Sequence, residues 1–418
     1  MPALGLDAAQ ANDVAAFLAT LGQPGDAGGA CSAAEVSGGA RLFTTLGCVA
    51  CHGAAAPAAA DGSLVSLALV ARKWQPLALE QFLRAPARGY RWIRMPDFHL
   101  TAVEARMLAG HVLAASVAAA PPAAAPGDAV RGRALAARAG CASCHTIDVA
   151  NRASSPRLDL LHDWSRGCLS DDVAGRGTAP DFALDGEDRE ALRAFCRGGF
   201  ESLERHDAAE FAERAMHELR CLNCHSRDQH HTEWHGGEPT GNGPPNLTWA
   251  GEKLQASFVE NILAGTLDFK PRPWLAARMP SFAAPAAAIA RGLSCMHGCS
   301  PEPVAASAPD AALAAIGKRL VSNKGGFSCT SCHAVGAQPA LQVFEAEGIN
   351  LMYSAERLRR DFFLRWIMNP MRIEPASRMP TYADDKGKTA FVEVLAGDAQ
   401  RQFEAIWEFL QGGRAITR

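Results

Sequence analysis

The feature that most constrains this chain is a short cysteine motif that occurs four times. The chain has 418 residues and 13 cysteines, and eight of these cysteines belong to copies of the pattern C-x-x-C-H. The four copies are Cys48, Cys51 and His52; Cys141, Cys144 and His145; Cys221, Cys224 and His225; and Cys329, Cys332 and His333. A disulfide framework does not require a histidine after every second cysteine. The pattern therefore indicates four separate sites of one kind.

Each motif carries the three groups that attach a haem covalently. Two thiols three positions apart can add to the two vinyl groups of one haem, and the next histidine then binds the iron as its proximal ligand. A thioredoxin-like C-x-x-C does not need that histidine, and a structural zinc site would need two ligand pairs that converge on one ion. We therefore predict four covalently attached haem c groups rather than zinc ions or redox dithiols.

A methionine follows three of the four motifs in the same tripeptide, R-M-P. The interval from the motif histidine to the methionine is 43 residues for Met95, 54 for Met279 and 46 for Met379. A thioether sulfur can occupy the sixth position of low-spin iron and raise its potential. Methionine more commonly serves as a packing residue, but the recurrence in one tripeptide favours ligation. We predict these three methionines as distal ligands.

The repeat extends to the segments around the ligands. Residues 38–47 are helix-like before the first motif, whereas an apolar helix, a turn and a strap that carries the methionine come after the motif. A capped helix then closes the unit. Gly39 and Gly132 both lie nine residues before a first haem cysteine. A missing side chain at that position permits two helices to cross closely.

This arrangement resembles the class I cytochrome c family, in which an N-terminal helix, C-x-x-C-H, middle helices, a Met-Pro strap and a C-terminal helix surround one haem. The resemblance covers nearly the whole chain. It implies an all-α fold of four tandem class I cytochrome c-like domains joined by Ala/Pro/Gly linkers. The expected domains span residues 36–118, 127–200, 205–300 and 312–413. The implied iron ligands are His52, His225 and His333 on the proximal side and Met95, Met279 and Met379 on the distal side, with His145 in the second motif.

The second unit departs from the pattern at the methionine. Residues 93–111 and 177–195 share P-D-F-x-L, a polar residue and a helix-like pattern, but Ala179 stands where the first copy has Met95. A methyl group cannot bind iron. The second haem is therefore either five-coordinate or closed by another side chain.

His162 is the best replacement ligand in the second unit, and Cys168 is a weaker one. The alternative for His162 is a surface position or a contact with a haem propionate. Cys168 and Cys196 could form a disulfide in this smaller unit, or Cys196 could be a buried free thiol. An open iron would bind CO or peroxide, so a peroxidase-like enzyme is an alternative function, although no distal acid–base pair is evident.

Other histidines and cysteines have more than one interpretation. His230, His231 and His235 could replace Met279 or bind a second metal, but a solvated Gly/Pro-rich loop is favoured. The segment C-M-H-G-C, with Cys295 and Cys299, lacks a histidine after its second cysteine. It is either half a metal site or, as we favour, a small disulfide. The role of one further cysteine, Cys31, is not assigned.

Three cations recur at one position of the repeat. Lys73, Lys253 and Arg357 fall in register, and each could pair with a haem propionate. A solvated helix charge is the alternative for any one of them.

The first residues of the chain resemble the closing part of a cytochrome unit. Residues 1–24 align with the segment that starts at Met95, and their equivalences are Met1 with Met95, Pro2 with Pro96, Leu6 with Leu100, Ala11 with Ala105 and Ala15 with Ala109. We expect a remnant of an upstream unit, hence an N-terminally truncated chain, since the given sequence has no export signal. Chance similarity of an alanine-rich helix is the alternative.

The expected function is one-electron transfer in the periplasm or another extracytoplasmic site. The net charge of −3 gives no nucleic-acid footprint, and no run of eighteen apolar residues predicts a membrane span. The expected partners are redox proteins, namely a dehydrogenase, a small cytochrome or an oxidase. A second alternative is that the chain is the electron-accepting part of a larger dehydrogenase.

Overall fold

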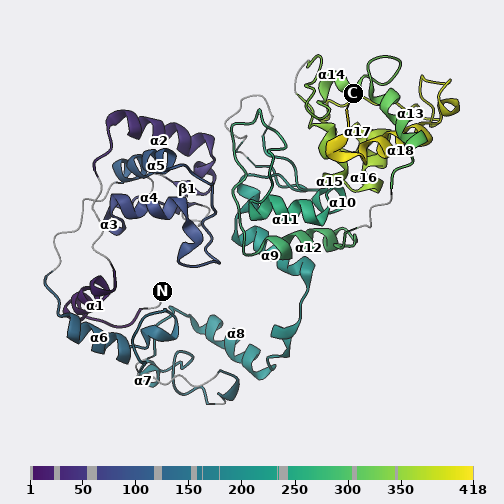
Figure 1. Ribbon diagram of the computed structural model, residues 1–418. Helices are drawn as coiled ribbons and strands as arrows, with labels where there is room; N and C mark the ends of the chain where they lie inside the picture. Colours follow the sequence, from purple (N-terminus) through teal and green to yellow (C-terminus); the bar gives the residue numbers. More distant parts are fainter. Residues whose placement is uncertain are drawn as a thin grey trace. The chain divides into compact units, whose positions relative to one another are not determined.

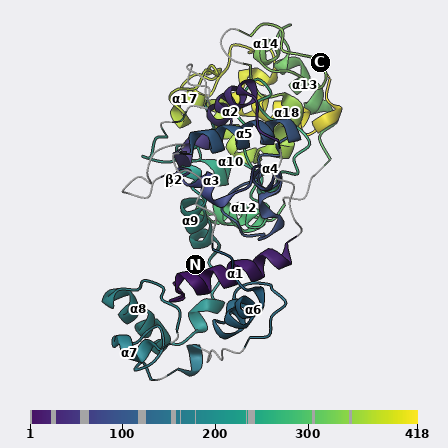
Figure 2. The ribbon, with the colours of Figure 1, turned by 90° about the vertical axis from the view of Figure 1, so that its left-hand side faces the viewer.

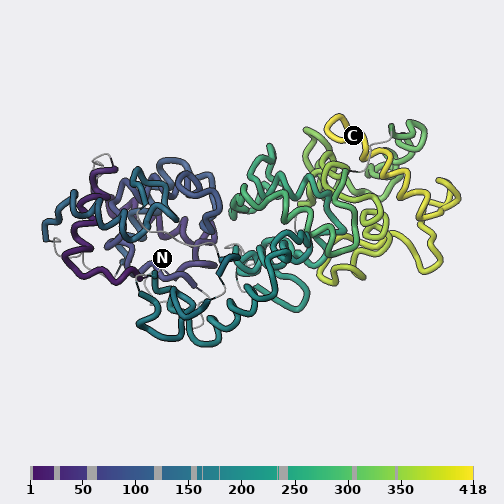
Figure 3. The backbone as a smooth tube through the Cα atoms, turned by 90° about the horizontal axis from the view of Figure 1, so that it is seen from below, coloured from purple at the N-terminus to yellow at the C-terminus, as the bar shows by residue number. Residues whose placement is uncertain are grey.

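The computed structural model contains mostly helices, as the sequence predicts. It describes residues 3–22, 29–53, 64–116, 125–151, 158–161, 163–177, 179–232, 234, 243–303, 308–343 and 347–417. The named strands in these ranges are β1 (His52–Gly53) and β2 (Val65–Ser66), which pair in parallel. Long irregular connections separate the helices (Figure 1, Figure 3). No described helix has the length and apolar character needed to cross a bilayer.

The chain divides into two compact units. Unit 1 comprises Met1–Gly29, Leu69–Ala78 and Val117–His206, and unit 2 comprises Ala30–Ala68, Leu79–Ser116 and Asp207–Arg418. The first, third and fourth haem motifs belong to unit 2, and the second belongs to unit 1. The four predicted domains themselves stay a prediction.

Unit 2 is built on three helix pairs. In each pair, the helix before a haem motif packs against a helix that follows the predicted methionine. The pairs are α2 (Ala33–Thr45) with α5 (Ala102–Ala115), α9 (Ala208–Glu218) with α12 (Ala286–Met296), and α13 (Ala311–Val321) with α18 (Ala399–Leu410). This is the arrangement of first and last helices that the sequence repeat predicts.

Glycines make the close crossings possible. A Cβ atom on Gly39 would lie 2.0 Å from the backbone oxygen of Met107, and one on Gly317 would lie 1.9 Å from that of Ala405. Real Cβ atoms do not approach other atoms so closely, so any larger residue would push the helices apart. The close crossing predicted at Gly39 is therefore confirmed.

Shorter elements complete both units. They are α3 (Val70–Lys73), α4 (Pro76–Arg84), α7 (Val173–Arg176), α10 (Ala250–Lys253), α11 (Ala256–Ala264), α14 (Cys329–Cys332), α15 (Ser354–Arg357), α16 (Arg360–Met368), α17 (Pro370–Ile373), and the 3-10 turns η1 (Cys48–Ala50), η2 (Pro86–Arg88), η3 (Cys141–Ser143), η4 (Leu158–Leu160), η5 (Glu201–Glu204), η6 (Cys221–Asn223), η7 (Leu351–Tyr353), η8 (Leu395–Gly397) and η9 (Gly413–Ala415). The largest core surrounds α13, α16 and α18, where Leu320 and Phe403 are fully buried.

Unit 1 has a helix pair of unexpected sequence order. Helix α1 (Ala8–Leu21) packs on α6 (Ala129–Arg138), the helix before the second haem motif (Figure 2). A Cβ atom on Gly132 would lie 1.9 Å from the backbone oxygen of Asp13. The close crossing predicted at Gly132 therefore exists, and its partner is a helix that precedes α6 by more than a hundred residues.

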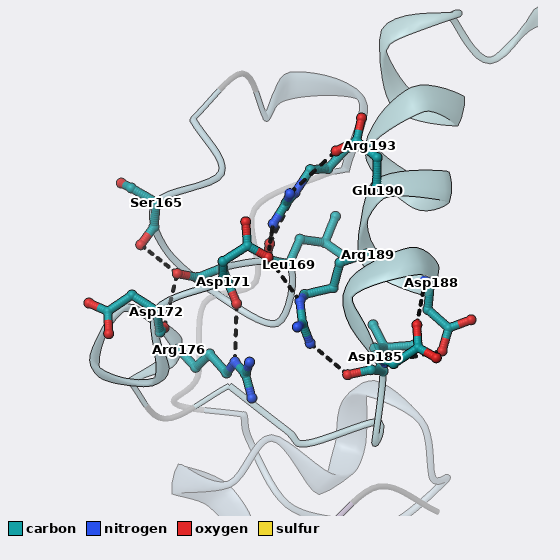
Figure 4. A network of polar contacts seen from close by, with 12 residues as sticks. Ser165, Leu169, Asp171, Asp172, Arg176, Asp185, Asp188, Arg189, Glu190 and Arg193 are labelled. Atoms are coloured by element: carbon teal, nitrogen blue, oxygen red, sulfur yellow. Dashed lines mark hydrogen bonds and ion pairs between the residues drawn. The ribbon is translucent and has the colours of Figure 1, made fainter.

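The helix α8 (Gly186–Arg197), which the sequence offered as the closing helix of the second unit, has other contacts. Arg193 donates to the carbonyl oxygen of Leu169 and forms an ion pair with Asp171 at 2.8 Å. Arg189 pairs with the same aspartate at 3.2 Å (Figure 4). These contacts attach α8 to the preceding loop by charge, and none of its described side chains is fully buried.

Candidate functional site

The four C-x-x-C-H motifs share one backbone conformation. The residue before each first cysteine has a left-handed backbone, with φ of 84° at Gly47, 72° at Gly140, 59° at Arg220 and 59° at Ser328. One helical turn follows, and it brings side chains three positions apart to one face. The two thiols of each motif therefore lie side by side, as attachment to one planar ring requires. Two of the four left-handed residues carry side chains, so the conformation does not depend on glycine.

Three of the motif histidines are oriented by backbone carbonyl groups. The Nδ1 atom lies 2.8 Å from the oxygen of Pro245 in His225, 2.8 Å from that of Ile349 in His333, and 3.3 Å from that of Val65 in His52. Because a carbonyl oxygen only accepts, each Nδ1 carries the proton and donates. The other nitrogen, Nε2, is then unprotonated and available to a metal.

These histidines are largely shielded from water. Only 7% of His225 is exposed, and burial lowers its pKa, as it does for His333 and His52. Burial likewise raises the pKa of Cys48 and Cys329 to about 12. Neutral imidazole beside two buried thiols suits haem, so the residues present fit this group.

The second motif differs from the other three. Cys144 is exposed, and so is His145, whose backbone nitrogen donates to Cys141 at 2.9 Å. The turn is the same, but Cys144 and His145 face water, whereas Cys141 is half-buried against the core around Phe17. Ala179 lies beyond it in the methionine position of the repeat, and the predicted replacement ligand His162 lies outside the described residues.

The three predicted methionine ligands have different environments. Met379 packs against the same core as Cys329, and its sulfur accepts a hydrogen bond from Nε1 of Trp366 at 3.2 Å. Met279 is 37% exposed, and Met95 lines a surface pocket of about 660 Å³. In the described part of the chain, the fourth motif is thus the one whose predicted methionine ligand packs against the same core as the motif's first cysteine.

No known family model, curated protein or solved structure matches this chain. The interpretation of the site therefore rests on the residues and their geometry.

A cluster of three cations lies beside the backbone bridge of Leu254 with Leu358 and consists of Lys253, Arg272 and Arg357. Burial, then Arg357 and Arg272, lower the pKa of Lys253 to about 8. Burial and Arg272 lower the pKa of Arg357 to about 10, and burial lowers the pKa of Arg272. The Nε atom of Arg357 is buried without a hydrogen-bond partner in the described chain. Lys253 also lies 5.3 Å from the ring centre of Trp366. Such a cluster favours an anion.

The three cations at the equivalent repeat position differ in how far they are buried. Lys73, the third member of the predicted set, is exposed. The equivalence of Lys253 and Arg357 therefore extends to their environment, whereas Lys73 matches the alternative of a solvated helix charge.

The remaining cysteines are free thiols, which contradicts the predicted disulfide of Cys295 and Cys299. Cys299 instead donates to the backbone oxygen of His297 at 3.7 Å. Cys168 and Cys196 are also free, which leaves the free-thiol alternative. Cys31, which had no assigned role, donates to the oxygen of Arg106 at 3.6 Å and anchors the segment before α2 to α5.

The histidines after the third motif are partly described. Nε2 of His230 lies 3.0 Å from the oxygen of Leu222, inside the motif, while His231 is exposed and His235 lies outside the described residues. No group of three or more His, Cys, Asp or Glu side chains in the described chain could hold a metal ion.

Several residues of the site have little or no signal in the sequence. The carbonyl partners of the histidines carry no sequence signal, because every residue has a carbonyl group. Trp366 and Arg272 left different traces. Trp366 lies at a repeat position with Phe82 as its counterpart, and that pairing could have marked it as a residue near the methionine strap. Arg272 falls within the four-residue-longer segment before Met279, where the register is lost.

Proposed function

We propose that this chain is a multihaem c-type cytochrome that transfers single electrons through four covalently bound haems. The observation that carries the proposal is the fourfold motif turn, in which paired thiols precede a histidine whose Nε2 is free in three of the copies. Four tandem cytochrome c-like domains, in the ranges that the sequence predicts, would each enclose one haem.

The chain's own residues would hold and tune each group. The paired cysteines would form the two thioethers, and the Nδ1 hydrogen bond would fix the orientation of each proximal imidazole. Met95, Met279 and Met379 would provide thioether sulfur on the other side, and Trp366 would orient the last of these. When bound, haem iron alternates between its ferrous and ferric states and so carries one electron.

Location and partners follow from this chemistry as part of the proposal. Covalent attachment of haem to C-x-x-C-H takes place outside the cytoplasm, which supports a periplasmic or other extracytoplasmic protein. The partners would be soluble or membrane-bound redox proteins, such as a dehydrogenase, a small cytochrome or an oxidase.

Haem content tests the proposal directly. The chain is produced behind a secretory leader in a bacterium that matures c-type cytochromes, and we expect four haems per chain by pyridine haemochrome assay and by mass. The haems should be reduced by dithionite and reoxidised reversibly. A matured chain without covalent haem, or one that carries zinc, would contradict the proposal.

A peroxidase-like activity at the second haem is the second candidate function. It is favoured by the exposed His145 and by Ala179 in the methionine position. If this iron is open, the reduced protein should bind CO at about one haem in four, as the four motifs imply. If no haem binds CO, every iron is closed and catalysis at this site is excluded.

The pH dependence of the unfolding free energy tests whether the cluster of Lys253, Arg272 and Arg357 binds a haem propionate. Without an anion, the folded chain holds Lys253 at a pKa of about 8, against 10.5 for the ordinary side chain. The unfolded chain then binds more protons between these values, so the free energy of unfolding would rise as the pH increases from 8 to 10.5. A bound carboxylate raises the folded pKa and abolishes this rise.

We therefore expect no such rise in the matured protein. Urea unfolding of wild type and Lys253→Met is compared across this pH range, with Lys318→Met at an exposed site of α13 as the control. A rise in wild type that is absent in Lys253→Met would show that no propionate lies beside the cluster.

A further inference from the structure

The first and third haem motifs touch each other, although they are far apart in sequence. Nδ2 of Asn223, between the cysteines of the third motif, donates to the oxygen of Ala50, between those of the first, at 2.6 Å. We propose that these two motifs form one electron-transfer pair and that the fourth motif follows the third, so that the path through unit 2 runs first, third, fourth. This inference rests on the proposed function.

The contact joins the attachment points themselves. Asn223 stands between Cys221 and Cys224, and Ala50 stands between Cys48 and Cys51, so the hydrogen bond lies between the two pairs of thiols. The ring of Trp234 covers Gly47, where a Cβ atom would lie 2.7 Å away. Thioether-linked edges of two haems would therefore meet here, and tunnelling rates rise steeply as such edges approach.

The methionine straps of the same two domains also pair. Asp97 and Ser281, each two residues after its methionine, exchange backbone hydrogen bonds of 3.1 and 2.8 Å. Arg278 forms a partly buried ion pair with Glu104 beside this bridge. Two separate contacts thus fix the first domain on the third, one at the proximal motif and one at the distal strap.

A different face of the third domain meets the fourth. Leu254 and Leu358 form an antiparallel bridge, in which Gln255 donates to the oxygen of Arg357 at 2.9 Å and Arg359 donates to that of Lys253 at 3.0 Å. The third domain therefore contacts the first and the fourth through separate surfaces. Each step moves one electron, with one iron oxidised as its neighbour is reduced.

The strap contact is tested by a disulfide. In the full chain, Asp97→Cys together with Ser281→Cys should form a bond on mild oxidation, so that no more free thiols are counted than in wild type. If the oxidised variant has two more free thiols than wild type, the two straps are not in contact. A disulfide was chosen because the bridge partners face each other directly, which suits its short reach.

The electron-transfer pair formed by the first and third haems is tested by EPR spectra and redox titrations of matured variants. Cys48→Ser with Cys51→Ser removes the first haem, and we expect the EPR spectrum and midpoint potential of the third haem to change, because a neighbouring charged iron is lost. Cys141→Ser with Cys144→Ser, which removes the haem of unit 1, is the reference and should change the third haem less. If the two variants change the EPR spectrum and midpoint potential of the third haem equally, the first and third haems are not an electron-transfer pair. A chain with four haems but no coupling would refute only this inference, whereas a chain without haem would refute the proposed function.

A second inference comes independently from α1. We propose that α1 is the closing helix of the second haem domain, in the place that α5 has in the first domain. This second inference rests on the same proposed function. Gly132 meets Asp13 and Phe17 on α1, as Gly39 meets Met107 and His111 on α5. Asp13 is therefore equivalent to Met107, and Phe17 is equivalent to His111. Both pairs are 94 positions apart, and this is also the offset between residues 1–24 and the segment that starts at Met95.

Two further contacts hold this segment in unit 1. Asp13, only 6% exposed, accepts from Nε of Arg131 at 2.8 Å and from the backbone of Asp128 at 2.6 Å. Ala3 forms a backbone bridge with Asp181, and in the repeat this bridge is equivalent to that of Asp97 with Ser281. The segment before α1 therefore occupies the position of a methionine strap.

The crossing of α1 with α6 provides the test of the second inference. In the matured chain, Gly132→Val would place a Cβ atom 1.9 Å from the backbone oxygen of Asp13 and so separate the two helices. We expect the second haem domain to unfold at a lower temperature and its haem to become more accessible to CO.

Ala134→Val is the matched control, since Ala134 is exposed on the same helix. If Gly132→Val has the same unfolding temperature and CO binding as Ala134→Val, the second inference is wrong.

Discussion

Replacing Cys329 and Cys332 by serine in one variant is expected to remove one haem of four. The thiols lie on one turn of α14, directly before His333, and Cys329 packs against the core around α13 and α18. Serine cannot form a thioether, and the core against which Cys329 and Met379 pack would lose its contacts with the haem. The fourth domain should therefore unfold at a markedly lower temperature than in wild type.

Haem stoichiometry and mass measure the first effect, and calorimetry measures the second. The control is Cys295→Ser with Cys299→Ser, which removes two thiols from a cysteine pair without a following histidine. This control should retain four haems. A loss of haem from the control, or none from the first variant, would refute the assignment of the motifs.

Gly317→Val is expected to be the most destabilising single substitution in the fourth domain. The new Cβ atom would lie 1.9 Å from the oxygen of Ala405, so α13 and α18 could not keep their present separation. Leu320 and Phe403, both fully buried at this crossing, would lose contacts. Overpacking of this kind costs about 1–3 kcal/mol of unfolding free energy, and we expect a value near the upper end.

Chemical unfolding of the matured protein, followed through the aromatic signal, measures this cost. Ala312→Val is the control, since it adds a β-branched residue to an exposed position of the same helix and costs only about 0.5 kcal/mol. Equal losses in the two variants would mean that the close crossing does not matter for stability.

The sequence predicted the features that depend on local spacing. The mostly helical class and the close helix crossings at Gly39 and Gly132 were predictable, because each depends on residues a few positions apart. The partner of Gly132 was not predictable. The register of residues 1–24 was visible in the sequence, but helical periodicity does not tell which of two candidate helices, α1 or α8, packs on α6.

Contacts between distant segments were equally inaccessible. Asn223 and Ala50 are ordinary residues at variable motif positions, and nothing in their types indicates a hydrogen bond across 173 positions. The predicted disulfide of Cys295 and Cys299 was wrong because spacing alone does not place two thiols within bonding distance. Burial is the main cause of the lowered pKa of Lys253, and Arg357 and then Arg272 add to it. Arg272 lies where the repeat loses its register, so the sequence did not indicate its contribution.

The bridge of Leu254 with Leu358 joins equivalent positions of two copies of one repeat. One copy contributes Lys253, Leu254 and Gln255, and the other contributes Arg357, Leu358 and Arg359 in the opposite direction. A surface that meets its own equivalent in this way is self-complementary, as in a twofold homodimer. The two copies therefore bind each other within one chain as two identical subunits bind across a twofold axis.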